Sequence, residues 1–309
     1  MRTAVAILAG AMVAVPMSAQ QTFRAGVDLV NFSVVVTDKQ GSPVSGLTAN
    51  DFEIVETGKP QTITYFAEGD AQDGDNLSEV LPLHLGLALD TSGSMEKDIS
   101  EVRTAVIKFL NANESAVDVT LVDFDTEVRI ARYAASDYAR LIERIRGRKP
   151  EGWTAFYDAL GVYLNGAANQ TGQKILLVYT DGGDTRSAMT YQELADLLKA
   201  SDVTVYAIGY LEQYTSSARN EQRMLLQRLA ALTGGQAFFP TSTKELDTVY
   251  GNIQREIAAR YSLGYVSSDT RTDGAWRKVE IRLKRSDLKG AKIRTRGGYF
   301  APYRESSSH

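Results

Sequence analysis

The residues of this chain most suited to chemistry are Asp90, Ser92 and Ser94, which offer one carboxylate and two hydroxyls. They stand at alternating positions, so the three side chains can converge, and Gly93 lets the backbone turn sharply between them. A donor set made only of oxygen is typical of sites for hard cations. We therefore predict a site for Mg²⁺, with Mn²⁺ or Ca²⁺ as alternatives.

A predicted α/β domain places these residues at a ligand-binding edge. Apolar runs typical of strands buried on both faces alternate with segments of helical periodicity. The expected strands are 83–89, 117–124, 175–180, 203–209 and 236–239, and the expected helices are 99–110, 136–147, 154–168, 190–200, 220–232 and 242–260. This alternation predicts a doubly wound, mostly parallel sheet with helices on both faces. Asp90 follows the first strand, where open sheets of this kind bind ligands.

The remaining strand patterns predict one antiparallel edge strand and a second domain. The tight turn 125–127 makes 117–124 and 128–133 a hairpin, with 128–133 at a sheet edge. Segments 25–68 and 261–302 alternate apolar and polar residues, and Asp273–Gly274 is a hairpin turn signal. Each segment is too small to bury a face alone, so we predict one β-sandwich with the α/β domain inserted in it. Two separate β extensions docked on the central domain are the alternative.

These patterns divide the chain into six parts. The predicted parts are a signal peptide at 1–19, the first half of the β-sandwich at 25–68, a linker at 69–81, the α/β domain at 82–260, the second half of the sandwich at 261–302 and a disordered tail at 303–309.

The N-terminus predicts export. Arg2 precedes an apolar stretch over 4–15, which is too short for a membrane span of roughly 20 residues, and Ser18 and Ala19 favour cleavage after Ala19. No other stretch reaches transmembrane length. We expect the mature protein to be periplasmic or secreted.

Composition excludes several classes of function. The formal net charge is −4 without a basic stripe, which argues against a nucleic-acid partner. There is no cysteine, and the only histidines are His84 and the terminal His309. The absence of cysteine excludes thiol catalysis, and the scarcity of histidine argues against most zinc chemistry and Ser–His–Asp catalysis.

The segment Asp90-x-Ser92-x-Ser94 resembles the metal-ion-dependent adhesion site of von Willebrand factor A (VWA) and integrin inserted domains. Two further elements of the family pattern follow in the right order. They are 152–155, which supplies Thr154, and 178–182, which supplies Asp181. The resemblance implies that Ser92 and Ser94 bind the ion directly, that the two aspartates act partly through waters, and that Thr154 engages or withdraws. The family often has glycine where Trp153 stands.

The flanks resemble those of exported bacterial VWFA-related proteins, chiefly in 27–38, 46–53, 261–265 and 298–302. This resemblance covers nearly all of the mature chain. It implies export and a role other than catalysis, but it supplies no ligand.

The predicted function is metal-dependent binding of a protein partner, in adhesion or complex assembly. Neutral hydroxyl ligands leave the charge of a cation incompletely neutralised, so an open position attracts an Asp or Glu carboxylate of the partner. The alternative is a metal-dependent hydrolase that activates water. Asp184 is the only nearby spare acid, and we favour a capping role for it. Trp153 is either an interface aromatic or packed under its loop, 210–214 could border the ligand surface, and no pattern indicates an oligomeric state.

Overall fold

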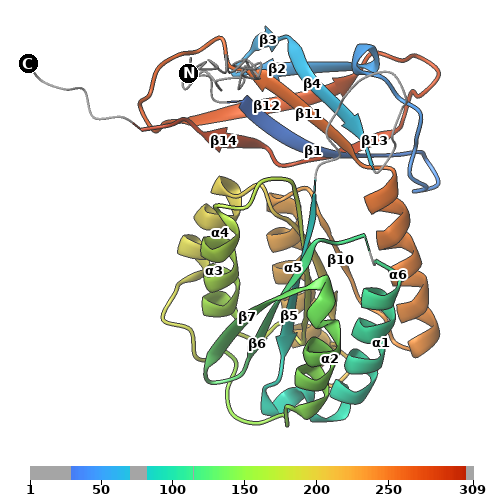
Figure 1. Cartoon of the computed structure of the whole chain (residues 1–309), viewed down its shortest axis with the longest axis vertical. Helices are drawn as coiled ribbons and strands as arrows, with labels where there is room; N and C mark the ends of the chain where they lie inside the picture. The colour runs from blue at the N-terminus through green and yellow to red at the C-terminus, as the bar shows by residue number, and fades with distance from the viewer. Residues whose placement is uncertain (1–28, 70–81, 114, 304–309) are drawn as a thin grey trace, which may run out of the picture.

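A computed structural model describes residues 29–69, 82–113 and 115–303 of the chain. They form two stacked parts, a domain of strands and an α/β domain (Figure 1). The predicted signal peptide 1–19 lies outside the described residues, as do all but the first residue of the predicted linker 69–81 and of the predicted tail 303–309. No helix in the described part of the chain is long and apolar enough to cross a membrane.

The α/β domain is built on a six-stranded sheet with the order β10-β9-β8-β5-β6-β7. Its strands are β5 (Leu83–Asp90), β6 (Asp118–Phe124), β7 (Val128–Ala134), β8 (Gln173–Thr180), β9 (Thr204–Gly209) and β10 (Gln236–Phe238). Neighbouring strands are parallel except β6 and β7, which form the expected antiparallel hairpin at one edge. The predicted fold class, a mostly parallel sheet with one antiparallel edge strand, is confirmed.

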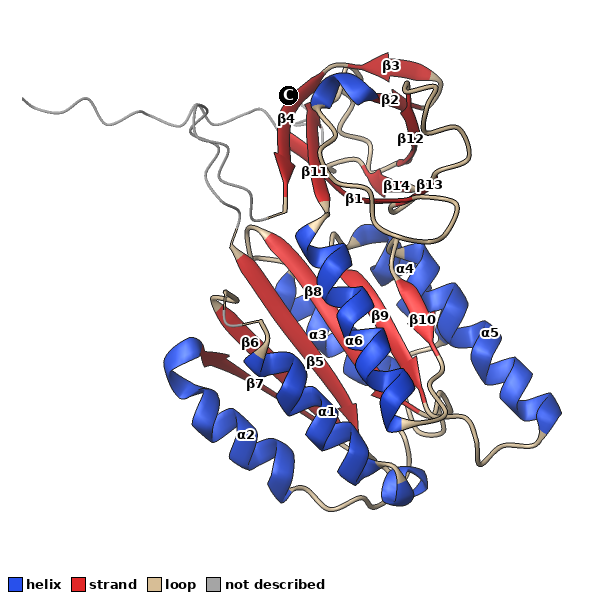
Figure 2. Cartoon of the chain, turned by 90° about the vertical axis from the view of Figure 1, so that its right-hand side faces the viewer, coloured by secondary structure: helices blue, strands red, loops and turns tan. Residues whose placement is uncertain are grey.

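Helices cover both faces of this sheet (Figure 2). One face packs against α1 (Ile99–Asn111), α2 (Tyr138–Gly147) and α6 (Thr243–Ala258), and the other packs against α3 (Phe156–Ala167), α4 (Tyr191–Ala200) and α5 (Ser216–Leu232). Successive residues of a strand point to opposite faces. In β8, Leu177 and Tyr179 therefore join one core while Leu176 and Val178 join the other.

Each helix differs from its predicted bounds by one to four residues, and the starts of α5 and α3 show why. Helix α5 begins at Ser216, four residues before the predicted start at 220. The prediction starts too late because the first turn of this helix is polar and carries no apolar periodicity. Helix α3 begins at Phe156 instead of 154, and Ala155 before it is not helical (φ −95°, ψ 61°). Thr154 therefore lies in a loop, where its side chain is not committed to a helix surface.

The second domain is a β-sandwich made from both flanks of the chain. One sheet has the order β13-β1-β11-β4, and the other has the order β14-β12-β2-β3. The strands are β1 (Leu29–Thr37), β2 (Phe52–Glu56), β3 (Lys59–Gln61), β4 (Ile63–Glu68), β11 (Tyr261–Val266), β12 (Trp276–Leu283), β13 (Lys292–Arg294) and β14 (Gly298–Phe300). One apolar core, with Phe32 and Leu263 from the first sheet and Ile54 and Val279 from the second, joins the two sheets. The α/β domain is thus inserted in the sandwich.

The hairpin predicted at Asp273–Gly274 is wrong. Gly274 does turn the chain in the left-handed region (φ +68°), and the Asp273 carboxylate accepts a hydrogen bond from the Ala275 amide. Strands β11 and β12 nevertheless belong to different sheets, so loop 267–275 crosses the sandwich instead of joining two paired neighbours. A turn signal fixes the local backbone but does not decide which strands pair.

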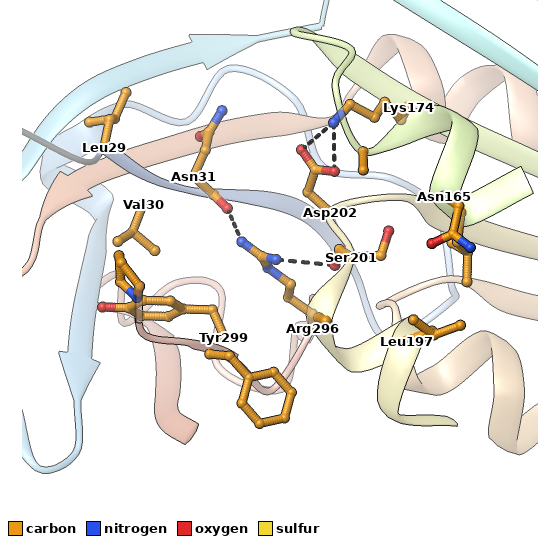
Figure 3. A pocket seen from close by; sticks show the side chains of 15 residues that line it. Leu29, Val30, Asn31, Asn165, Lys174, Leu197, Ser201, Asp202, Arg296 and Tyr299 are labelled. Atoms are coloured by element: carbon orange, nitrogen blue, oxygen red, sulfur yellow. Dashed lines mark hydrogen bonds and ion pairs between the residues drawn. The ribbon is translucent and has the colours of Figure 1, made fainter. Parts of the chain in front are cut away.

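The two domains meet at the N-terminal ends of the central strands (Figure 2). Figure 3 shows the contact around Arg296, whose guanidinium donates to the Ser201 carbonyl of the α/β domain (3.1 Å) and to the Asn31 carbonyl of the sandwich (2.7 Å). Beside it, the buried Lys174 ammonium pairs with Asp202 at 2.7 Å. The C-terminal strand ends, where ligands bind in this fold, therefore lie at the free end of the molecule.

Candidate metal centre

Strand order brings the two predicted aspartates together. Strands β5 and β8 are adjacent and parallel, with Leu89 in register with Tyr179. Asp90 is the last residue of β5, and Asp181 comes directly after β8. The chain continues from β5 through α1 to β6 on one side of β5, while β8 lies on the other side. The two carboxylates therefore stand at the point where strand order reverses, which is the ligand site of doubly wound sheets.

Asp90 is fully buried and held by two donors. Its Oδ1 accepts a hydrogen bond from the Ser92 amide (2.9 Å), and its Oδ2 accepts one from the Thr180 hydroxyl (2.7 Å). Burial, and then the negative charge of Asp181, raises the pKa of Asp90 to about 7. No lysine or arginine among the described residues forms an ion pair with either carboxylate. Two buried acids without a cation fit a site for a divalent ion.

The two serines stand on the loop that follows β5. Ser92 is extended (φ −69°, ψ 164°) and begins the short 3₁₀ helix Gly93–Lys97. The Ser92 and Ser94 hydroxyl oxygens are 3.1 Å apart, and Ser92 is buried while Ser94 is exposed. The Gly93 amide donates to the Gly152 carbonyl at 3.1 Å, which ties this loop to the one that carries Thr154. Ser94 thus gives the site an open side.

Thr154 is held by its backbone. Its amide donates to the Thr185 hydroxyl (3.0 Å), and its carbonyl accepts from the Thr185 and Arg186 amides (2.9 and 3.0 Å). These bonds join the loop before α3 to the loop after β8. Trp153 next to it is 65% exposed, so its side chain is not packed under the loop and stands at the rim. All five predicted residues therefore lie at the end of β5 or on the loops that follow β5 and β8 and precede α3.

Two residues that sequence reasoning did not select hold the aspartates. Thr180 donates to Asp90, and its Oγ1 also accepts from the Gly182 amide at 3.0 Å. The Gln213 side-chain amide donates to Asp181 Oδ2 at 3.2 Å. Gln213 lies within 210–214, which was expected to border the ligand surface. The sequence indicates Thr180 only by its position, as the polar residue that ends the apolar run beginning at Ile175.

Thr180→Val should weaken Mg²⁺ binding without changing the fold. Valine keeps the volume and removes the hydroxyl that fixes Asp90, and loss of a residue that orients a ligand typically lowers metal affinity by roughly 10- to 100-fold. Mg²⁺ titration followed by calorimetry measures this change. Thr248→Val is the control, because it removes a hydroxyl that donates to a backbone carbonyl on the exposed surface of α6. Equal affinity in wild type and Thr180→Val would contradict the orienting role.

Asp184 is engaged in hydrogen bonds at the start of α3 and in the loop that follows it. Its Oδ1 accepts hydrogen bonds from the Tyr157 amide (3.2 Å), in the first turn of α3, and from the Ser187 hydroxyl (2.6 Å). The capping interpretation of Asp184 is confirmed. His84 lies near the start of β5, at the opposite end of the strand from Asp90, where it contacts Asp118. His84 is therefore remote from the predicted metal ligands, whereas Asp184 lies on the loop that follows Asp181.

A model of the von Willebrand factor type A domain matches residues 84–252, which is more than half of the chain. The chain belongs to this family. The pilus adhesin SpaC from Lactobacillus rhamnosus GG is structurally similar to this VWA protein, with a TM-score of 0.50 at 13% identity, over 87% of this chain and 49% of the adhesin.

Two further solved structures are similar to the chain at lower TM-scores. The von Willebrand factor type A protein from Catenulispora acidiphila has a TM-score of 0.47 at 13% identity, over 93% of this chain and 77% of its own. An aerotolerance-related membrane protein from Bacteroides fragilis has a TM-score of 0.46 at 16% identity, over 57% of this chain and 98% of its own. No curated protein sequence matches the chain. At these identities the likeness concerns the fold alone.

Proposed function

We propose that this VWA protein is an exported, non-enzymatic module that captures an acidic side chain of a protein partner at a divalent cation, with Mg²⁺ as the expected ion. The residues that would hold the ion are Asp90, Ser92, Ser94, Thr154 and Asp181. The observation that carries the proposal is the pairing of two buried carboxylates with an exposed hydroxyl at the switch point of the sheet.

The arrangement of donors favours docking over hydrolysis. Asp90 and Asp181 each accept hydrogen bonds from neighbouring groups, which hold both carboxylates in place at the buried side of the site. Ser94 and the exposed Trp153 stand on the side that a partner can reach. A bound cation supplies an electrophilic point for a partner's carboxylate oxygen, and hydroxyl ligands neutralise none of its charge. Trp153 would add apolar contact area around that point.

A metal-controlled capture experiment tests this function. The exported protein, whose mature N-terminus we expect at Gln20, is immobilised and exposed to envelope extract in Mg²⁺. We expect partners that are released by EDTA and that Asp90→Ala does not retain. An excess of free acetate or of an Asp-containing peptide should compete with them. Partners retained equally with EDTA and by Asp90→Ala would sink the proposal.

A further inference from the structure

A polar cleft of about 430 Å³ lies at the other end of the α/β domain, where it meets the sandwich. The turn after β1, the short strand β13, strand β10 and the C-terminal part of α6 form its walls. Figure 2 shows that this end of α6 is remote from the strand ends that carry the candidate metal centre. The cleft is therefore a separate surface, and it joins both domains.

Cationic side chains outnumber acidic ones by two in this cleft. Arg255 from α6 and Lys292 and Arg294 from β13 line it, and Glu256 is the one acidic side chain among the described residues that do so. Arg255 and Lys292 are exposed, whereas the Arg294 side chain is 22% exposed. The excess charge thus comes from both domains.

Glu256 does not neutralise this excess, because its carboxylate is shared between Arg294 and the hydroxyl of Tyr206, which the buried Arg260 also contacts. Its Oε2 accepts a hydrogen bond from the Tyr206 hydroxyl (2.8 Å), and that hydroxyl accepts one from Arg260 (2.7 Å). Glu256 Oε1 lies 2.5 Å from Arg294 Nη2. Arg260 and Glu256 are both buried, so the one negative charge of Glu256 faces Arg294 directly and Arg260 through the Tyr206 hydroxyl, in a region of low dielectric.

Arg294 also has unused hydrogen-bond donors. Its Nη2 pairs with Glu256, and among the described residues its buried Nη1 has no hydrogen-bond acceptor. Buried donors without partners are costly and rare in native proteins. An anion in the cleft toward which the Arg294 side chain turns would give these donors an acceptor and balance the charge.

We propose that this cleft binds a phosphate monoester carried by a polyol, such as a sugar or glycerol. A guanidinium group matches the spacing of phosphate oxygens, and a phosphate monoester carries a charge of about −1.5 to −2 at neutral pH, which balances the excess. A carboxylate would balance only half of it. Polar side chains of Gln40, Ser42, Gln236 and Asn252 line the rest of the cleft and suit the hydroxyl groups of the carrier.

Titration calorimetry with glycerol 3-phosphate tests the site, in low salt and with EDTA present. EDTA removes divalent ions, so a failure of the proposed metal-dependent function does not affect this result. We expect the wild-type protein to bind with a dissociation constant of about 1 mM or below, and glycerol, which lacks the charge, to give no binding. Absence of binding by glycerol 3-phosphate would overturn the proposal.

Three variants locate the binding. Arg294→Gln should weaken it by roughly tenfold or more, as expected for a lost charged hydrogen bond. Because Arg294 also contacts Glu256, Lys292→Gln provides a second variant on an exposed side chain without a salt bridge in the described chain, and it should weaken binding by roughly threefold or more. Lys199→Gln changes a cation outside the cleft and should have no effect. Unchanged affinity in both cleft variants would contradict the assignment.

Vesicles distinguish the two sources of such a ligand. A phosphate monoester on glycerol occurs both free and as the headgroup of phosphatidic acid. Sedimentation with phosphatidic acid vesicles that is lost in Lys292→Gln, and that is absent with phosphatidylcholine, assigns the lipid as the source. Binding of glycerol 3-phosphate without vesicle binding assigns a soluble or polymer-borne phosphate.

Discussion

Asp90→Asn is expected to abolish the stabilisation of this protein by Mg²⁺. An ion that binds the folded chain alone stabilises it by about 2.7 kcal/mol at 100 times its dissociation constant. Asparagine keeps the size of the side chain but removes one of the two buried negative charges, and it cannot accept from both Ser92 and Thr180 in the same way. The wild-type unfolding temperature should rise with Mg²⁺, and that of Asp90→Asn should not.

Differential scanning calorimetry in EDTA and in increasing Mg²⁺ measures this effect. Glu96→Gln is the matched control, because it removes the same charge from an exposed position on the same loop. It should keep the full Mg²⁺-dependent rise. The same rise in Asp90→Asn as in wild type would mean that the ion stabilises the protein from another site.

The strands and their ligand edge could be predicted because burial leaves a strong pattern. Strand β5 is buried on both faces, so it is a continuous apolar run that ends at Asp90. The pattern does not state that β8 lies beside β5. The adjacency of β5 and β8 brings Thr180 into contact with Asp90, although the two residues are 90 positions apart in the sequence. The sequence alone therefore does not identify the Thr180 hydroxyl as part of the site.

The small size of the two flanks predicts that they form one sandwich. It does not predict which of their strands pair. Strand β1 lies between β11 and β13, so each of its neighbours comes from the other flank of the chain. Alternation identifies a strand that buries one face and says nothing about its partner. The hairpin prediction at Asp273–Gly274 fails for this reason, because a local turn signal does not determine which strands pair.

The cationic cleft gave no signal in the sequence. Arg255, Lys292 and Arg294 are ordinary members of polar segments, and 37 positions separate Arg255 from Lys292. Only the packing of α6 against β13 brings them together, and only the buried contacts of Glu256 show that their charge is not balanced. Sites formed between domains depend on the fold more than sites formed at a single strand end.

Glu56→Ala is expected to destabilise the sandwich by about 3–5 kcal/mol, the usual cost of removing one partner of a buried ion pair. Glu56 follows Phe52 and Ile54 on the inner face of β2 and is 2% exposed. Its carboxylate accepts hydrogen bonds from Tyr265 (2.8 Å) and Tyr299 (3.1 Å), and Arg277 lies 3.6 Å away. Alanine would leave the buried guanidinium of Arg277 without this partner, and it would remove the group that joins strands of both sheets.

Urea unfolding followed by tryptophan fluorescence isolates this effect, because the chain has two tryptophans and they lie in different domains. A Trp153→Phe background changes an exposed rim residue and leaves Trp276 of β12 to report on the sandwich. Glu53→Ala is the control on the same strand. Its carboxylate is 42% exposed and lies 3.7 Å from Arg282, so its loss should cost about 1 kcal/mol or less. A similar shift of the Trp276 transition in both variants would show that the buried network does not hold the two flanks together.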